Sequence, residues 1–592
     1  MADIFTTLDE RKDLNTDQKK RIRHWLEGGF DQETKQVIVQ MIEKKDSTLV
    51  DAFYTVLSFG TAGLRGIMGV GSNRINEYTI SWATQGLANY VHTLGVKNPR
   101  AVIGYDSRNH SRHFAQTTAQ VLAGNGFTVF LCKNLRPTPL VSFACRYYKC
   151  QTAVMITASH NPPEYNGYKV YWDDGGQVLP PHDVGIIEEV QKIQDPKQVK
   201  KSDLNDPRII WVEEEVDKAY LDAIRTLRLY PHAEGPLRII YSSLHGTGIT
   251  LVPHALQQCD FSDVRYVEKQ VIPDGNFPTA HFPNPEEPEA MKLGTDKMLR
   301  EEADLFIATD PDCDRVGVVV HHKGKAVPLT GNQVVALLAK HICQALTEQK
   351  RMPPRPAFVK TIVTTELFRS IVESYKASCV DVLTGFKYIA ERIRQWEQES
   401  NGKQFVFGGE ESYGYLFGTY ARDKDAVIST CLIAEVARHA KRAGKTLVDY
   451  LNDIYLEWGF FAEIVVSWKF EETKVGKDTM AQVMSNLRKL PPQKLSEHAV
   501  VAYSDFLIQE KQLINGTKEK INLPVADVLI FELDEGSRVV VRPSGTEPKI
   551  KVYFMLRQKL ETKTLEALER AKQEAAKRAQ LLEAAVKLIS FQ

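Results

Sequence analysis

Three stretches of this 592-residue sequence repeat one order of elements, and this repeat constrains the fold more than any other feature. Each stretch has an apolar strand, a loop of small residues, a helix, a second strand, and a third strand that ends in a polar loop. Strands that alternate with helices form mainly parallel sheets, and ligands bind beyond the carboxyl ends of those strands. We therefore expect an α/β fold with three similar mixed α/β domains. The predicted elements are first strands 101–105, 237–241 and 357–361, helices 114–122, 250–258 and 365–375, second strands 128–131, 264–267 and 380–383, and third strands 153–157, 305–309 and 405–407.

The two ends of the chain do not follow this repeat. Residues 1–45 have the pattern of amphipathic helices, to which we assign packing and not catalysis. Near the other end, 528–533, 538–542 and 549–556 read as strands with tight turns, followed by a helix over about 560–588, which predicts an α+β domain. The expected domains are a helical preface with domain I (1–203), domain II (204–325), domain III (326–455) and domain IV (456–592).

Composition excludes several classes of protein. Seventy-five basic residues balance seventy-five acidic ones, so no long-range field favours nucleic acid or a membrane surface. The eight cysteines show no C-x-x-C spacing, no basic-then-apolar leader opens the chain, and no apolar run reaches the ~18–20 residues of a membrane span. We expect a cytoplasmic protein with reduced thiols that acts on small molecules as a monomer or weak dimer.

The first of the three polar loops contains a serine. The predicted strand 153–157 ends just before Ser159 and His160, which places a hydroxyl at the rim of a sheet, where a nucleophile can meet a substrate. Most serines at strand ends are only polar caps. A hydrolase is excluded because no G-x-S-x-G elbow surrounds Ser159. A serine that carries a phosphoryl group instead requires a metal and basic side chains.

The second polar loop can supply the metal. Asp310, Asp312 and Asp314 alternate with other residues, so in an extended loop their carboxylates can point the same way. Oxygen ligands favour a hard cation, and Mg²⁺ is the usual partner of phosphate oxygens. Such a triplet can also be an acidic surface turn. An EF-hand is excluded because Arg315 and His321 replace its glycine and closing glutamate, and Arg315 is a candidate phosphate contact.

Further candidate residues are basic or hydrogen-bonding side chains in glycine-containing turns. Arg65 follows the turn 59–64, and Lys169 follows Ser159 closely enough for one loop to return it to the hydroxyl. The turn 542–546 combines a guanidinium, two hydroxyls and backbone amides freed by glycine, which is a way to hold phosphate without a metal. The third polar loop offers groups that bind sugar hydroxyls. The proposed substrate-binding residues are Arg315, Gly385, Lys387, Glu410, Ser412, Arg542, Ser544, Gly545 and Thr546.

Together these motifs resemble the α-D-phosphohexomutase superfamily, the phosphoglucomutase/phosphomannomutase family, from Gly60 to about Tyr553. Four family loops occur in the right order, and residues 163–171 and the cysteine in the metal loop look most like the phosphopentomutase-type phosphoglucomutase branch. Residues 157–162 are similar to the family's serine loop and 310–315 to its metal loop. Residues 409–414 are similar to its sugar loop and 542–546 to its phosphate loop.

The resemblance implies a four-domain, heart-shaped phosphoglucomutase that interconverts glucose 1-phosphate and glucose 6-phosphate. Phosphorylated Ser159 would give its phosphoryl group to the sugar, and the resulting glucose 1,6-bisphosphate would turn over and return its other phosphate. Mg²⁺ would bind Ser159 and the three aspartates, while Arg65, His160 and Lys169 would assist proton transfer and stabilise charge. Whether His160 or Lys169 is the general base stays open, because an arginine seldom loses its proton.

Two departures from the family pattern leave the preferred sugar open. The arginine loop reads Gly60-Thr61-Ala62-Gly63 where some members have Gly-Thr-Ser-Gly, and the preface is longer than in short bacterial forms. Mannose, ribose and deoxyribose phosphates are therefore further candidate substrates. A glucose 1,6-bisphosphate synthase is an alternative within the same class. A non-catalytic sugar-phosphate-binding protein is the alternative of another class, which predicts loss of the serine or the aspartates, and all of these are present.

Overall fold

The computed structural model describes residues 2–57, 63–231, 235–471, 474–489, 491–544 and 549–591. The chain divides into two compact units. Unit 1 comprises residues 1–328, 390–398 and 414–435, and unit 2 comprises 329–389, 399–413 and 436–592. In the part of the chain that the structure describes, no helix has both the length and the apolar character needed to cross a membrane.

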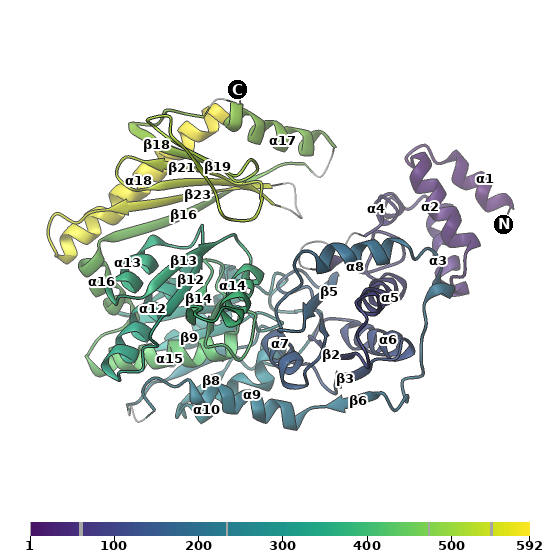
Figure 1. The fold of residues 1–592 in the computed structure, drawn as a ribbon, viewed down its shortest axis with the longest axis horizontal. Coiled ribbons are helices and arrows are strands. Elements are labelled where there is room, and N and C mark those ends of the chain that lie inside the picture. The colour runs from purple at the N-terminus through teal and green to yellow at the C-terminus, as the bar shows by residue number, and fades with distance from the viewer. Residues whose placement is uncertain are drawn as a thin grey trace. The chain divides into compact units, whose positions relative to one another are not determined.

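The first residues form a helical preface whose hydrophobic core also includes Trp82 and Ile193 of domain I. A capping box between Asn15 and Gln18 begins the second helix. Trp25 is 2% exposed and stacks on Phe30, with 4.3 Å between ring centroids. The predicted preface is thus helical and continues to Ala52, beyond the expected residue 45. Its helices are α1 (Ala2–Glu10), α2 (Thr16–Glu27), α3 (Gln32–Glu43) and α4 (Thr48–Ala52) (Figure 1).

Domain I contains a six-stranded sheet in the order β1-β5-β4-β2-β3-β6. Strands β4, β2, β3 and β6 are parallel, β5 is antiparallel to β4, and β1 at the edge is antiparallel to β5. Helices α6 and α7 pack on this sheet. The strands are β1 (Leu64–Ile67), β2 (Arg100–Tyr105), β3 (Thr128–Cys132), β4 (Thr152–Ile156), β5 (Tyr165–Trp172) and β6 (Ile209–Val212); the helices are α5 (Glu77–Thr93), α6 (Ser111–Gly124), α7 (Thr138–Tyr147), α8 (His182–Gln191) and the short η1 (Pro196–Gln198).

Domain II contains a five-stranded sheet in the order β11-β10-β9-β7-β8. Strands β9, β7 and β8 are parallel and β10 is antiparallel to β9. The strands are β7 (Ile239–Ser242), β8 (Val264–Tyr266), β9 (Leu305–Thr309), β10 (Val316–His322) and β11 (Lys325–Leu329); the helices are α9 (Glu214–Thr226), η2 (Thr247–Thr250), α10 (Val252–Gln258) and α11 (Pro288–Arg300).

Domain III has β12 at its centre, parallel to both β13 and β14. Thr365, the first residue of the predicted helix 365–375, is the N-cap of α13 and accepts a hydrogen bond from the backbone N–H of Leu367. The strands are β12 (Pro356–Thr361), β13 (Ser378–Val382), β14 (Gln404–Gly409) and β15 (Tyr415–Phe417); the helices are α12 (Gly331–Glu348), α13 (Glu366–Ser374), α14 (Phe386–Gln398), α15 (Ala426–Arg442) and α16 (Leu447–Trp458).

The C-terminal domain is an antiparallel sheet in the order β16-β23-β22-β21-β18-β19-β20, with α18 packed on β16 and β23 (Figure 1). The last helix begins at Leu565 and not near residue 560, because the Thr564 side chain caps it by accepting from the N–H of Ala567. The elements are β16 (Phe460–Lys469), α17 (Lys474–Lys489), β17 (Lys494–Leu495), β18 (His498–Asp505), β19 (Glu510–Leu513), β20 (Lys518–Lys520), β21 (Leu529–Leu533), β22 (Arg538–Pro543), β23 (Lys549–Gln558) and α18 (Leu565–Ser590).

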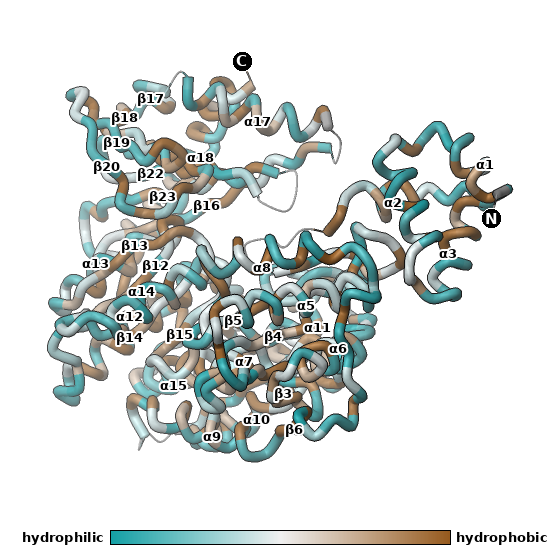
Figure 2. The backbone as a smooth tube through the Cα atoms, turned by 45° about the vertical axis from the view of Figure 1, so that its right-hand side comes forward, coloured by the Kyte–Doolittle hydropathy of each residue, from teal (hydrophilic) through white to brown (hydrophobic). Residues whose placement is uncertain are grey.

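The predicted internal repeat is confirmed by strand order. In each of the first three domains the first strand is central, with the second strand on one side and the third on the other, as in β3-β2-β4, β8-β7-β9 and β13-β12-β14. Hydrophobic stretches alternate along the chain with hydrophilic connections (Figure 2). The chain thus has three similar, mainly parallel α/β domains and a fourth α+β domain, as expected.

The packing of the domain II core can be tested at Phe306 in β9. It is fully buried, and a methyl group on Gly294 of α11 would lie 2.1 Å from its ring, so helix and strand are in close contact. We expect Phe306→Ala to lower the free energy of unfolding, measured with urea, by about 3–5 kcal/mol, because the surrounding residues cannot fill the cavity left by the ring. Phe282 is 54% exposed in the same domain and is the matched control. For Phe282→Ala we expect a change within about 0.5 kcal/mol, and equal losses in the two variants would contradict this packing.

Candidate active site

Ser159 lies in a tight turn just after β4. Its φ of +55° is in the left-handed region, and its backbone N–H donates to the Thr157 hydroxyl at 2.8 Å. The residue is 3% exposed. A left-handed residue that is not glycine persists only where its surroundings hold it, and such residues cluster at functional sites. The turn therefore holds the serine in a defined, buried position.

Arg108 holds this turn from behind. Its buried guanidinium donates to the carbonyl oxygens of Ser159 at 2.6 Å and Asn161 at 2.5 Å, and further to those of Pro162 and Tyr165. Asp106 pairs with this guanidinium at 3.3 Å and accepts from the Thr157 hydroxyl at 2.6 Å. The sequence interpretation missed both residues. The available signal was two charged residues directly after the first strand.

The aspartate loop is shaped by its own first carboxylate. One oxygen of Asp310 accepts the backbone N–H groups of Asp314 and Arg315, both at 3.0 Å. The N–H of Cys313, whose φ is +56°, donates to the carbonyl of Asp310 at 2.9 Å. These bonds curl the loop after β9 and turn its carboxylates inward.

A second loop supports the aspartates. The N–H of Thr247 donates to the carbonyl of Pro311 at 2.7 Å, and a Cβ on Gly246 would lie 2.2 Å from the Pro311 Cα. Only glycine therefore fits at position 246. On the domain I side, Thr138 at the start of α7 donates its hydroxyl to Asp312 Oδ2 at 3.0 Å. The sequence interpretation named neither supporting contact.

The structure brings the serine and the aspartates together within unit 1. Ser159 Oγ donates to Asp310 Oδ2 at 3.1 Å and lies 3.1 Å from His160 Nδ1. The three aspartates are at most 2% exposed. A hydroxyl, an imidazole and three buried carboxylates thus share one small site, although 151 positions separate Ser159 from Asp310.

Two lysines compensate this negative charge. Lys169 Nζ lies 2.8 Å from Asp312 Oδ2 and 3.1 Å from Asp314 Oδ2. Lys424 Nζ lies 3.2 Å from the same oxygen of Asp314 and 3.3 Å from Asp423 Oδ1. Lys169 was predicted, whereas Lys424 was missed.

The segment 422–425 has a signal that sequence reasoning could have used. It carries four alternating charges directly before an apolar helix, and all four residues are buried. Asp423 accepts from the hydroxyl of Tyr171 at 2.9 Å, and Asp425 accepts from Tyr220 at 2.6 Å. The other oxygen of Asp425 accepts the N–H of Val427 at the start of α15. These bonds fix the segment that carries Lys424.

Burial and neighbouring charges separate the two candidate bases. Burial lowers the pKa of His160 well below its usual value, and the charges of Arg315 and Arg65 lower it further. Burial alone would also lower the pKa of Lys169, but the carboxylates of Asp312 and Asp314 outweigh it and raise that pKa. His160 is thus held neutral and Lys169 charged.

The aspartate triplet suits a hard cation. Its carboxylates offer oxygens that lie within 4.8 Å of one another. Among the described residues, Asp312 Oδ1 and Asp314 Oδ1 are buried oxygens without a hydrogen-bond donor. A buried carboxylate oxygen left without a donor is costly unless a cation satisfies it. The oxygen-only donor set is of the kind that binds Mg²⁺.

The two predicted arginines of unit 1 lie at the border of this site. Arg65, on β1, is exposed and donates to Asn161 Oδ1 at 3.0 Å, within the serine loop. The backbone of Arg315 belongs to the aspartate loop, while its guanidinium lies 3.3 Å from Glu286 Oε1.

The predicted sugar-binding residues lie in unit 2. Glu410 is 4% exposed and accepts the N–H of Gly385 at 2.8 Å, so the loops after β13 and β14 meet. Lys387 Nζ lies 5.2 Å from the centre of the Tyr388 ring, and Ser412 is half-buried. A Cβ on Gly331 would lie 1.9 Å from the carbonyl oxygen of Glu411, so α12 begins directly against this loop.

The predicted phosphate loop is described in part. Arg542 lies near the end of β22, and the N–H of Ser544 donates to the carbonyl of Lys549 at 2.8 Å. Gly545 and Thr546 lie outside the described residues, as do Gly60, Thr61 and Ala62 of the arginine loop.

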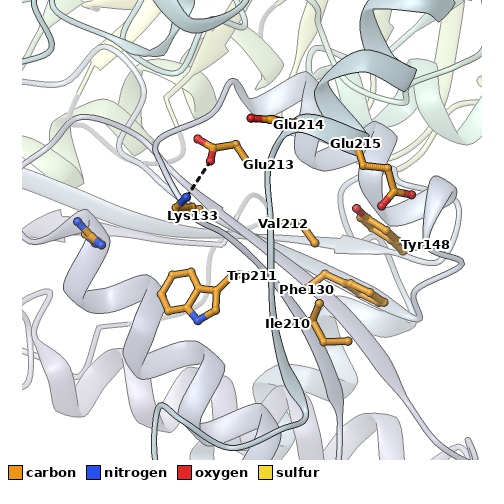
Figure 3. A pocket seen from close by; sticks show the side chains of 10 residues that line it. Phe130, Lys133, Tyr148, Ile210, Trp211, Val212, Glu213, Glu214 and Glu215 are labelled. Carbon is orange, nitrogen blue, oxygen red and sulfur yellow. Dashed lines mark ion pairs between the residues drawn. The ribbon is translucent and has the colours of Figure 1, made fainter.

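A hollow of about 860 Å³ beside β6 is separate from these residues (Figure 3). Phe130, Tyr148 and Trp211 line it together with charged groups such as Lys133 and Glu213, whose charged atoms lie 3.6 Å apart. None of the predicted site residues contributes to its wall. The candidate active site is therefore defined by the serine and aspartate loops and not by this hollow.

Comparison with known proteins identifies the family. Four consecutive family models match, described as Phosphoglucomutase/phosphomannomutase alpha/beta/alpha domain I (residues 56–197), domain II (218–324), domain III (330–457) and C-terminal domain (485–578). A phosphoglucomutase of Staphylococcus aureus (strain bovine RF122 / ET3-1) is 37% identical over 540 residues, covering 90% of this chain and 95% of the relative. One of Staphylococcus haemolyticus (strain JCSC1435) is 36% identical, covering 86% and 95%.

Solved structures share the fold. Parafusin (a phosphoglucomutase) from Paramecium is 15% identical and aligns with a TM-score of 0.67, covering 91% of this chain and 96% of that one. A putative phosphomannomutase from Thermus thermophilus is 23% identical, with a TM-score of 0.63 and coverage of 89% and 99%. The chain therefore belongs to the phosphoglucomutase/phosphomannomutase family.

Proposed function

We propose that this phosphoglucomutase interconverts glucose 1-phosphate and glucose 6-phosphate with Ser159 as the phosphoryl carrier. One observation carries the proposal. The Ser159 hydroxyl lies 3.1 Å from a carboxylate of a buried aspartate triplet that two lysines and a cation can neutralise. The relatives that cover most of this chain are named phosphoglucomutases, which supports glucose over other sugars.

We assign a divalent cation, Mg²⁺, to Asp310, Asp312 and Asp314, with an oxygen on Ser159 completing the set. The two buried carboxylate oxygens without donors support this assignment. When bound, the cation neutralises charge on the phosphoryl oxygens.

The residues of the chain account for the transfer itself. In the forward step, the bond between phosphorus and Ser159 Oγ breaks while a bond to a sugar hydroxyl oxygen forms. The proton of that hydroxyl ends on Ser159 Oγ, so that the serine leaves as a neutral hydroxyl. We propose His160 as the base that takes this proton and passes it on, because its Nδ1 lies 3.1 Å from Ser159 Oγ. Lys169 already donates to two carboxylates, so its proposed role is to hold charge. Return of the other phosphoryl group from glucose 1,6-bisphosphate restores the phosphoserine.

The remaining residues are proposed to bind substrate. Lys424 would share the charge-holding role of Lys169, and Arg65 and Arg315 would contact phosphoryl oxygens. Glu410 would accept hydrogen bonds from sugar hydroxyls, Lys387 would donate to them, and Gly385 and Ser412 would complete this part of the site. A guanidinium, two hydroxyls and backbone amides suit the non-transferring phosphate, and this set is Arg542, Ser544, Gly545 and Thr546.

We also propose four domains, which the sequence predicts as 1–203, 204–325, 326–455 and 456–592. Because β6 pairs with β3 in the domain I sheet and β11 ends at Leu329 in the domain II sheet, we move the first boundary past Val212 and the second past Leu329. The ranges of the family models, which begin at residues 56, 218, 330 and 485, support this division. The helical preface precedes the first of these ranges.

Ser159→Ala is expected to lower turnover of glucose 1-phosphate on the order of 10⁴-fold or more, because the phosphoryl carrier is lost. Initial rates with catalytic glucose 1,6-bisphosphate measure this. Ser47 is exposed in the preface and makes no side-chain cap bond, so Ser47→Ala is the matched control and should keep full activity. Substantial turnover in the Ser159 variant would refute the carrier role. In the same assay, turnover of mannose 1-phosphate or ribose 1-phosphate faster than that of glucose 1-phosphate would make that sugar phosphate the preferred substrate.

Asp312→Asn should raise the Mg²⁺ concentration for half-maximal activity by about 10- to 100-fold, since one anionic ligand is replaced by a neutral amide. Mg²⁺ titration of the initial rate is the measurement. Asp296 is 52% exposed and pairs with Lys292 on the surface, so Asp296→Asn should leave the titration unchanged. An unaltered response of the Asp312 variant would contradict the ligand assignment.

Arg542→Ala should raise KM for the sugar phosphate by about 10- to 100-fold while changing kcat less, because a charge-assisted bond to phosphate is lost in ground and transition states alike. Steady-state kinetics measures KM and kcat separately. Arg570 is an exposed arginine of α18, and Arg570→Ala is the control. An unchanged KM in the Arg542 variant would count against the phosphate loop.

A further inference from the structure

One fully buried lysine of unit 2 has no part in the reaction described above. Lys360 lies near the end of β12, and its Nζ lies 2.7 Å from Glu366 Oε1 and 3.1 Å from Asp381 Oδ1. The same ammonium donates to the carbonyl oxygen of Thr364 at 3.1 Å and to that of Thr361 at 3.3 Å. Lys360 therefore holds both ends of the turn between β12 and α13 and ties this turn to the first residue of α13.

The turn that Lys360 holds, residues 361–365, contacts the predicted sugar loop. The buried hydroxyl of Thr361 donates to Glu411 Oε2 at 3.3 Å. The hydroxyl of Thr364 lies 2.8 Å from that of Thr361 and donates to the carbonyl of Gly409 at 3.5 Å. These bonds reach the residues on either side of Glu410, so the turn supports the loop to which we assign sugar binding.

The same turn also packs against the sheet of the C-terminal domain. Ile362 and Val363 are buried in one hydrophobic cluster with residues of β21, β22 and β23, among them Val540. Val540 pairs in register with Ile530 on one side and Tyr553 on the other, and both belong to this cluster. Cross-strand partners lie on the same face of a sheet. One face of this sheet is therefore packed on the turn after β12.

That face of β22 carries three residues of different kinds. Side chains alternate along a strand, and β22 pairs with β23 without a bulge, so Arg538, Val540 and Arg542 lie on one face. The guanidinium of Arg538 pairs with Glu366. Glu366 thus accepts one cation from each domain, Lys360 of domain III and Arg538 of domain IV. An ionic contact and an apolar contact therefore hold β22 on domain III before the strand reaches Arg542.

We propose that Glu366 and Lys360 are positioning residues that set where Arg542 lies relative to the sugar loop. The inference rests on the proposed function, in which Arg542 contacts the phosphate and Glu410 the sugar of one substrate molecule. One series of contacts connects the two groups, from the sugar loop through the turn after β12 to Lys360, Glu366 and β22. Loss of the Glu366 carboxylate therefore misplaces a binding group without removing any group that touches substrate.

Glu366→Gln keeps the size of the side chain and removes its charge. We expect it to raise KM for glucose 1-phosphate by about 5- to 20-fold and to change kcat by less than about threefold, because no reacting group is altered. Arg538→Met breaks the same ion pair from domain IV and should raise KM alike, which keeps the test valid if the Glu366 variant folds poorly. Arg538→Lys keeps the charge and should hold KM within about threefold of the wild-type value. Steady-state kinetics with catalytic glucose 1,6-bisphosphate is the measurement.

The double variant tests whether both residues act through one contact. Because Glu366→Gln and Arg538→Met remove the same ion pair, KM of the double variant should exceed the larger single effect by no more than about twofold. Two effects on KM that multiply would overturn the inference, as would a fall of kcat with KM unchanged.

Lys518 provides a control within the same sheet. It lies on the edge strand β20, is 60% exposed and pairs with Glu510 at 2.9 Å, so Lys518→Met should keep the wild-type KM. Arg542→Ala separates the inference from the proposed function. An unchanged KM in that variant would overturn the phosphate assignment and the inference with it. A raised KM there, together with an unchanged KM in Glu366→Gln, would overturn the positioning role alone.

Discussion

The candidate active site of unit 1 depends on the burial of three carboxylates within one short loop. Asp310, Asp312 and Asp314 are nearly inaccessible to water. In such a buried environment like charges repel strongly and have lost their hydration. Such a loop is stable only when opposite charges surround it. Lys169 from domain I and Lys424 from the segment before α15 supply two of them, and the two carboxylate oxygens without donors are available to a cation.

The repeated sheet explains why such chemistry gathers at strand ends. In each α/β domain the third strand lies beside the central first strand, and its carboxyl end opens into a polar loop. Three copies of one scaffold can thus present a serine loop, an aspartate loop and the loop that carries Glu410 without changing their cores. In this arrangement the loop residues can differ in function between the domains, while the apolar strands that support them pack in the same way.

Several residues shape the site without reacting. Arg108 binds four carbonyl oxygens of the serine loop, and Gly246 allows close approach of a neighbouring loop to Pro311. Neither was predicted, because a single glycine carries no pattern of its own and the charged residues after the first strand were not considered. Their roles follow from backbone groups that must be paired once they are buried.

The sequence by itself determined the local features of this protein. Strand periodicity predicted the three repeated domains, and short motifs predicted Ser159, Lys169 and the three aspartates, because these signals lie within a few consecutive residues. Helix ends set by single caps, such as Thr564, were placed less well. Only the tertiary structure decided that Lys424 reaches Asp314, and that Ser159 meets Asp310 across 151 positions. Such contacts depend on how whole elements pack, and no local pattern encodes the distance between two loops that are far apart in the chain.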